Sequence, residues 1–147
     1  MQQSFFVPAR RGLLALALAC GATAALAHGD VVPQAVDTST LPQLGTKWRE
    51  SNPYSSGEGH KEALRIGSSA YNQNCARCHG LEAISGGIAP DLRYLELGAD
   101  GDAWYMERYR HGAVRDGKVY MPAFEEVLGQ KAGWAIRAFL ETKYTED

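Results

Sequence analysis

The chain has 147 residues and a formal net charge of −2, with 15 Lys and Arg against 17 Asp and Glu. This length allows one folded domain at most once a leader is removed. The mildly acidic balance, without a basic stripe, argues against nucleic acid as a partner.

The first 27 residues are typical of a signal peptide. Arg10 and Arg11 form a charged start, residues 12–26 are small and apolar, and residues 25–27 read Ala-Leu-Ala, an A-x-A cleavage site. The apolar run is shorter than the ~20 strongly apolar residues of a membrane span. We therefore expect an exported, periplasmic protein that begins at His28 and has no stable membrane anchor.

Cys20 offers a competing way to process the leader. The stretch Leu-Ala-Cys-Gly at 18–21 loosely resembles a lipoprotein site, but Ala17 stands where that pattern usually has Leu. The A-x-A site is therefore the better match, and whether Cys20 is ever lipidated stays open.

Residues 28–57 form an N-terminal arm rich in Pro, Gly, Ser and Thr, which precedes a domain at 58–147. Its three prolines prevent a long helix. The arm also carries large apolar side chains, at Leu41, Leu44, Trp48 and Tyr54. We favour an arm that wraps the domain and buries these side chains, because a free tail rarely carries Trp. An arm that docks a partner is the alternative.

Two helices are predicted from apolar residues at helical spacing, at about 61–74 and about 130–144. Glycine inside a helix is unfavourable, so Gly67 in the first helix indicates close approach of another element. We expect the two helices to cross there, with Gly67 admitting Phe139 or Leu140 into the contact.

Directly after the first helix the chain reads Cys75-Ala-Arg-Cys78-His79, the attachment pattern of c-type haem. The spacing places both thiols on one side of the chain, where they can add to two vinyl groups of one porphyrin. His79 can then offer its imidazole to the iron. A zinc site would need a second ligand pair, and a thioredoxin-like pair would need a βαβ pattern, and the sequence has neither.

The remaining segments predict short helices and loops. We expect an irregular loop over 80–90, one helical turn at 91–95, a helix over 102–110 capped by Asp102, and a turn over 112–118. A short helix should run from Pro122 to Leu128 and end at Gly129. No β-sheet is predicted, so the fold class is all-α around one haem.

Met121 is the first candidate for the sixth iron ligand. It lies in an irregular stretch, and Pro122 prevents a helix from continuing through it. Met106 is placed mid-helix, where core packing is expected, and His111 and His60 are less suited by position. His/Met ligation leaves no open position on the iron and suits one-electron transfer. A haem enzyme or small-ligand sensor with a labile sixth ligand is the alternative.

Four further residues are candidates around the haem. Pro90 follows His79 by 11 residues and can offer its carbonyl to the His79 Nδ1–H, which would fix the tautomer. Arg93, Trp104 and Tyr105 can bond the propionates. Packing against the ring is the plain alternative for the two aromatics, and a surface charge for Arg93.

The order Gly67, Tyr71, Cys75–His79, Ala89-Pro90, Met121-Pro122 and Phe139-Leu140 resembles class I cytochromes c. The resemblance covers about residues 60 to 144. It implies an all-α fold with crossed N- and C-terminal helices, one covalent haem c, and soluble one-electron transfer.

A narrower resemblance is carried by residues 28–37 and by YNQNCARCHGLEAISGGIAPDLRYL at 71–95. These segments are similar to the periplasmic cytochromes c-550 that accept electrons from PQQ-dependent (quinoprotein) ethanol dehydrogenases. That family implies a PQQ-dependent alcohol dehydrogenase as donor, and an oxidase or another cytochrome as acceptor. We expect a monomer that is not an enzyme. A fixed electron-transfer subunit of a larger complex, anchored by the arm, is the alternative.

Overall fold

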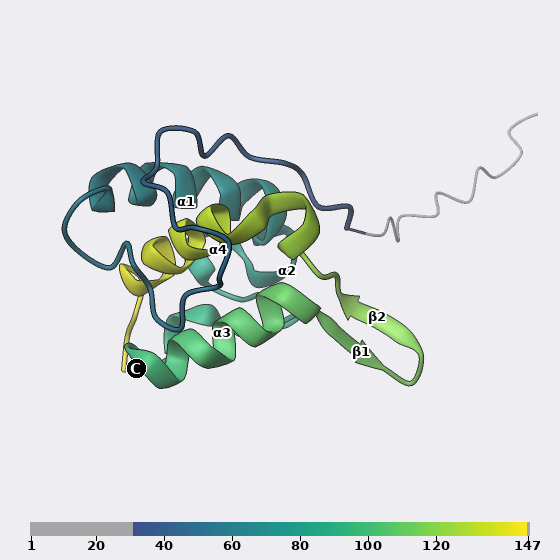
Figure 1. The fold of residues 1–147 in the computed structure, drawn as a ribbon. Coiled ribbons are helices and arrows are strands. Elements are labelled where there is room, and N and C mark those ends of the chain that lie inside the picture. The colour runs from purple at the N-terminus through teal and green to yellow at the C-terminus, as the bar shows by residue number, and fades with distance from the viewer. Residues whose placement is uncertain (1–30, 147) are drawn as a thin grey trace, which may run out of the picture. The chain divides into compact units, whose positions relative to one another are not determined.

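The computed structural model describes residues 31–146, so the predicted signal peptide, Cys20 and His28 lie outside the described residues. Its elements are α1 (His60–Asn74), α2 (Ala76–His79), η1 (Leu81–Ala83), η2 (Leu92–Tyr94), α3 (Ala99–His111), β1 (Ala113–Arg115), β2 (Lys118–Met121) and α4 (Glu125–Glu141) (Figure 1). The all-α fold class is confirmed. None of the described helices is long and apolar enough to span a membrane.

Helices α1 and α4 pack against each other (Figure 1), and Gly67 lies at their contact, as the sequence predicts. A Cβ added at Gly67 would lie 1.9 Å from the carbonyl oxygen of Ala135. The partner is therefore the backbone of α4 and not Phe139 or Leu140, because the missing side chain lets the two backbones meet directly. The Phe139 ring instead lies 5.3 Å from the ring of Tyr71.

Helix α4 contains a break at Gly129, whose φ of 70° lies in the left-handed region. The predicted short helix and last helix are therefore both present, joined in one element. The helix starts at Glu125, after Phe124, and ends at Glu141 instead of Tyr144. Its last turn tightens, because the N–H and the hydroxyl of Thr142 both donate to the Phe139 carbonyl.

The prediction that the chain has no β-sheet is wrong. Strands β1 and β2 form an antiparallel hairpin in which Val114 pairs with Val119 and Arg115 with Lys118. The turn between them is Asp116-Gly117, and both residues have positive φ. Asp-Gly is favoured in two-residue hairpin turns, because both central residues of such a turn need positive φ. The strands have only three and four residues, which is why the segment reads as a plain turn.

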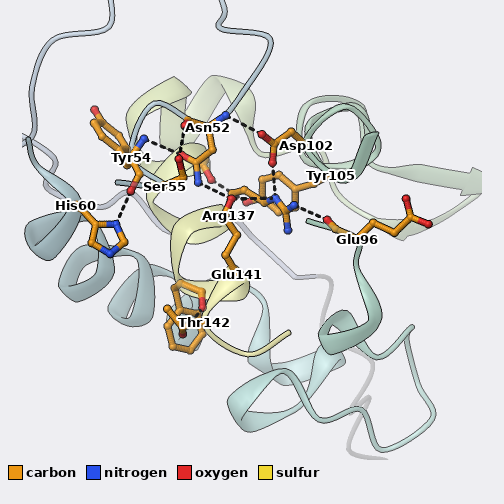
Figure 2. A network of polar contacts seen from close by, with 12 residues as sticks. Asn52, Tyr54, Ser55, His60, Glu96, Asp102, Tyr105, Arg137, Glu141 and Thr142 are labelled. Carbon is orange, nitrogen blue, oxygen red and sulfur yellow. Dashed lines mark hydrogen bonds and ion pairs between the residues drawn. The ribbon is translucent and has the colours of Figure 1, made fainter. Parts of the chain in front are cut away.

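Asp102 does not cap α3, which begins three residues earlier at Ala99. Its side chain is buried and accepts a hydrogen bond from Nε of Arg137, at 2.7 Å from Oδ1 (Figure 2). Nη2 of Arg137 donates to the Glu96 carbonyl. Arg137 is fully buried, so this ion pair joins α3 to α4 inside the protein.

The N-terminal arm contacts α1, α3 and α4, and the burial expected for its apolar side chains is confirmed. Leu41, Leu44 and Tyr54 are buried, and Trp48 is half-buried under the Arg110 guanidinium. Asn52 connects the arm to the buried ion pair (Figure 2). Its backbone N–H donates to Asp102 Oδ2, and Nδ2 of its side chain donates to Oε1 of Glu141.

The start of the arm is fixed beside the cysteine motif. The N–H of Gln34 donates to Oδ1 of Asn74 at 2.7 Å, and Nδ2 of Asn74 donates back to the Gln34 carbonyl. Asn74 is buried and immediately precedes Cys75. The arm therefore spans the length of the domain, from the cysteines to the ion pair at the start of α3.

Candidate functional site

One helical turn holds the two cysteines and the histidine. Cys75 ends α1, and its N–H donates to the Tyr71 carbonyl. The N–H groups of Cys78 and His79 both donate to the Cys75 carbonyl, at 3.1 and 3.0 Å. Side chains three apart in such a turn lie on one side. Both thiols are free and half-buried, so they are placed to react with one ligand.

The imidazole of His79 is oriented by a backbone carbonyl. Its Nδ1 lies 2.8 Å from the oxygen of Pro90. A carbonyl can only accept, so Nδ1 carries a proton, and in the neutral imidazole Nε2 keeps its lone pair. This is the tautomer that binds a metal through Nε2. His79 is buried, and the hydrogen bond to Pro90 fixes the direction of its ring.

The chain turns sharply after His79 and is attached to α1. Gly80 has a φ of +80°, and a Cβ there would lie 1.8 Å from the Ile84 carbonyl oxygen. The Tyr71 hydroxyl donates to the Gly80 carbonyl at 2.8 Å, and burial raises the Tyr71 pKa. Glu82 and Ala83 both have positive φ, so the loop returns toward His79 through backbone that side chains disfavour.

Met121 is the last residue of β2, not part of an irregular loop as predicted. Its thioether is half-buried and packs against the same apolar core as Cys75. A Cβ at Gly112 would lie 2.3 Å from the Met121 carbonyl oxygen, and the Phe124 N–H donates to the Tyr109 carbonyl. Residues at the end of α3 therefore contact the chain at Met121 and again at Phe124, just after Pro122.

The other candidate ligands have different surroundings. Met106 is buried within α3, where packing was expected. His111 is exposed, and its Nε2 lies 3.7 Å from Glu107. Nδ1 of His60 lies 2.7 Å from the Tyr54 carbonyl oxygen. Among the four candidates, Met121 is thus the one that combines partial burial with a position outside a helix.

The three residues predicted to bond propionates all have partners within the protein. Both Nε and Nη2 of Arg93 donate to the carboxylate of Asp91. Trp104 is 47% exposed, with the Arg108 guanidinium over its ring. Tyr105 is buried, and its hydroxyl donates to the Gly133 carbonyl between α3 and α4. Their propionate roles stay predictions.

Two residues near the site were missed from the sequence. Ser85 and Asp91 form hydrogen bonds on either side of Pro90. For Asp91, its position just before the helical turn η2 could have indicated a capping role, since its side chain accepts from the Arg93 N–H.

The donor set fits a covalent haem c. Burial, followed by the charge of Cys78, raises the pKa of Cys75 to about 12, so the unreacted thiol is neutral at ordinary pH. The imidazole presents Nε2, and the half-buried thioether of Met121 is a soft, neutral donor. Two thiols and an imidazole nitrogen are the groups that a covalent haem c requires, and a thioether is one of the sixth ligands that its iron accepts.

Comparison with known proteins agrees with this chemistry. Residues 62–140 match a family model described as "Cytochrome C oxidase, cbb3-type, subunit III". Cytochrome c550 of Pseudomonas aeruginosa is 59% identical over 138 residues, which cover 93% of this chain and 95% of the relative. The similarity therefore includes the arm as well as the helical domain.

Two enzymes show a more limited likeness. The quinohemoprotein alcohol dehydrogenases ADH-IIG and ADH IIB of Pseudomonas putida are 34% identical over 66 residues and 30% identical over 87 residues. The matched segments cover 45% and 58% of this chain but only 8% and 12% of the enzymes. No solved structure matches. The motif, the fold and the likeness to cytochrome c550 together show that this chain belongs to the class I cytochromes c and carries one covalent haem c.

Proposed function

We propose that this protein is a periplasmic one-electron carrier whose haem is bound by Cys75 and Cys78 and ligated by His79 and Met121. The observation that carries the proposal is the hydrogen bond between His79 Nδ1 and the Pro90 carbonyl, which leaves Nε2 as a ligand. The family relationship to cytochrome c550 supports the carrier role.

The chain's own residues set the conditions for electron transfer. A bound haem c supplies the one-electron couple. The Pro90 carbonyl holds the ring of His79 in one orientation and makes the imidazole a stronger donor. A neutral thioether from Met121 favours the reduced state. Both residues are held by backbone contacts, so little rearrangement accompanies a change of oxidation state.

A PQQ-dependent alcohol dehydrogenase is the proposed donor, and an oxidase or another cytochrome the proposed acceptor. The donor assignment is supported by the likeness of this chain to short segments of two quinohemoprotein alcohol dehydrogenases. A carrier must leave each partner after electron transfer, so its docking must be weak. Transient redox complexes accordingly bury less than about 1,200 Å². We therefore propose a monomer that binds each partner transiently.

The test is the near-infrared methionine–iron absorption band of the ferric protein. We expect the band in the unaltered protein and its loss in Met121→Ala. Met106→Leu is the matched control, because Met106 is buried in α3, and it should keep the band. A band that persists in Met121→Ala contradicts the assignment. Absence of the band in the unaltered protein, together with ready binding of carbon monoxide, favours the enzyme or sensor alternative.

A second candidate function is a fixed subunit of an oxidase. It is favoured by the description of the matching family model, which names a subunit of a cbb3-type oxidase. Purification from native cells at low salt separates the two candidates. The carrier elutes alone and is reduced by added PQQ-dependent alcohol dehydrogenase in a second-order reaction. The fixed subunit co-elutes with oxidase polypeptides, which would contradict the proposed carrier.

A further inference from the structure

Pro90 cannot fix its own carbonyl. Its ring locks φ and it has no N–H to anchor the peptide. The remaining soft dihedral is ψ, which sets both the direction of the Pro90 carbonyl and the position of Asp91. Whatever holds the residues on either side of Pro90 therefore determines how its carbonyl meets His79 Nδ1, 2.8 Å away.

Ser85 contacts both neighbours of Pro90. Its hydroxyl donates to the Ala89 carbonyl, and its N–H donates to Oδ2 of Asp91 at 3.2 Å. The Gly87 N–H donates to the same hydroxyl at 3.0 Å. Ser85 is half-buried. One serine thus closes the loop on itself and contacts the carbonyl before Pro90 and the carboxylate of the residue after it.

Asp91 provides the second support. Its Oδ1 accepts from the N–H and Nε of Arg93, both at 3.0 Å, and its Oδ2 accepts from Arg93 Nη2 at 2.8 Å in addition to Ser85. Hydrogen bonds from Arg93 hold the pKa of Asp91 at about 2, so the carboxylate is charged at neutral pH. With four donors, the carboxylate has little freedom to turn.

This cluster is attached to the rest of the domain. The Arg93 carbonyl accepts from the Thr145 N–H at 3.0 Å, beyond the end of α4. Lys143, from the same end, forms an ion pair with Glu82 in the loop after His79. The loop over 80–93 is therefore held against the C-terminal segment and does not depend on the haem alone for its shape.

We propose that Ser85 and Asp91 are positioning residues that hold the Pro90 carbonyl against His79 and thereby lower the reduction potential of the haem. The inference rests on His79 as an iron ligand, as proposed above. A hydrogen bond from Nδ1 to a carbonyl makes imidazole a more basic ligand. A more basic ligand favours ferric iron. Loosening the support therefore raises the potential.

The experiment measures the reduction potential of the full-length haem protein in Ser85→Ala. We expect the ferrous-to-ferric ratio at a fixed ambient potential to rise about threefold or more, where tenfold corresponds to about 59 mV for one electron. Ser55→Ala is the matched control, because the Ser55 hydroxyl also donates to a backbone carbonyl, that of Asn52, in the arm. The control should leave the ratio unchanged, and Ser85→Thr, which keeps the hydroxyl, should restore it.

A second readout follows the hydrogen bond itself. Exchange of the His79 Nδ1 proton with solvent, measured by NMR, should be faster in Ser85→Ala than in Ser55→Ala. If Ser85→Ala does not retain haem, Asp91→Asn is measured against Asp116→Asn, which removes a carboxylate in the hairpin turn. Both the potential and the exchange rate should rise in Asp91→Asn alone.

The proposal is overturned if Ser85→Ala keeps its methionine–iron band but leaves the potential and the exchange rate unchanged. It is equally overturned if Ser55→Ala shifts the potential as much. These results differ from failure of the proposed function, which appears in the unaltered protein as a missing methionine–iron band or as a haem not ligated by His79.

Discussion

Gly67 sets the distance between two helices by the side chain it lacks. Its replacement Gly67→Ala would place a Cβ 1.9 Å from the Ala135 carbonyl oxygen, so α1 and α4 must separate. We expect the free energy of unfolding to fall by about 1–3 kcal/mol, as in other overpacked cores. Guanidinium denaturation of the haem protein measures it.

The control for this substitution is Gly86→Ala, in the loop after the cysteine motif. No atom lies within 4 Å of a Cβ added there, so its stability should stay within about 0.5 kcal/mol of the unaltered protein. Equal stability of Gly67→Ala and Gly86→Ala would contradict the role assigned to the crossing.

Asp91 makes the stability of the protein depend on acid pH. Hydrogen bonds and the charge of Arg93 lower its pKa from 3.8 to about 2. Because the folded pKa is the lower one, its contribution is complete above about pH 4 and is lost as the pH falls through 2. We expect Asp91→Asn to flatten the decline of urea stability between pH 4 and pH 2. An unchanged slope would contradict this prediction.

At the scale of elements, the ion pair between Asp102 and Arg137 joins α3, α4 and the arm (Figure 2). Both side chains are almost fully buried. Removing one partner leaves an uncompensated charge, so Arg137→Met should lower the free energy of unfolding by about 3–5 kcal/mol. The measurement is urea denaturation at neutral pH.

The surface pair Arg65 and Glu62 is the matched control, since Arg65 is largely exposed. Arg65→Met should change stability little. Replacing both buried partners by apolar residues should recover part of the loss, because no charge then stays buried alone, although the Asn52 N–H loses its acceptor. A double variant no more stable than Arg137→Met would contradict this account.

The helices were predictable because apolar periodicity and glycine act locally. The first helix was placed to within one residue, and Gly129 was expected to end a helical segment. The hairpin was missed because Val114 and Val119 are exposed, which leaves no alternation between buried and exposed residues. Asp102 was misassigned because its partner, Arg137, lies 35 residues away.

In the site, the sequence indicated the contact between His79 and Pro90 because both belong to one short segment. The partner of Arg93 was not foreseen, although Asp91 lies two residues away. A charged side chain can meet a neighbour, a propionate or solvent, and composition does not distinguish these. The folded conformation of the loop over 80–93 determines which of these partners Arg93 contacts, and the sequence does not specify that conformation.

At the scale of the whole molecule, net charge should govern encounters with partners. The formal charge is −2, and removal of a leader with Arg10 and Arg11 would take it to −4. We expect a partner with a basic rim, so the rate of reduction by the donor should fall as salt rises from low to physiological concentrations. Stopped-flow reduction over a salt series measures this. A rate independent of salt would contradict the prediction.

The arm also determines the order in which the chain can fold. Its hydrogen bonds join residues 40 positions apart at Gln34 and Asn74, and 89 positions apart at Asn52 and Glu141. Contacts so distant in sequence close slowly, because the chain between them must first lose its freedom. The hydrogen bond between Asn52 of the arm and Glu141 of α4 therefore cannot form until α4 is in place. Until the arm closes, Asn74 lacks its two hydrogen bonds with Gln34, and we expect the neighbouring cysteines to be more accessible for haem attachment than in the folded protein.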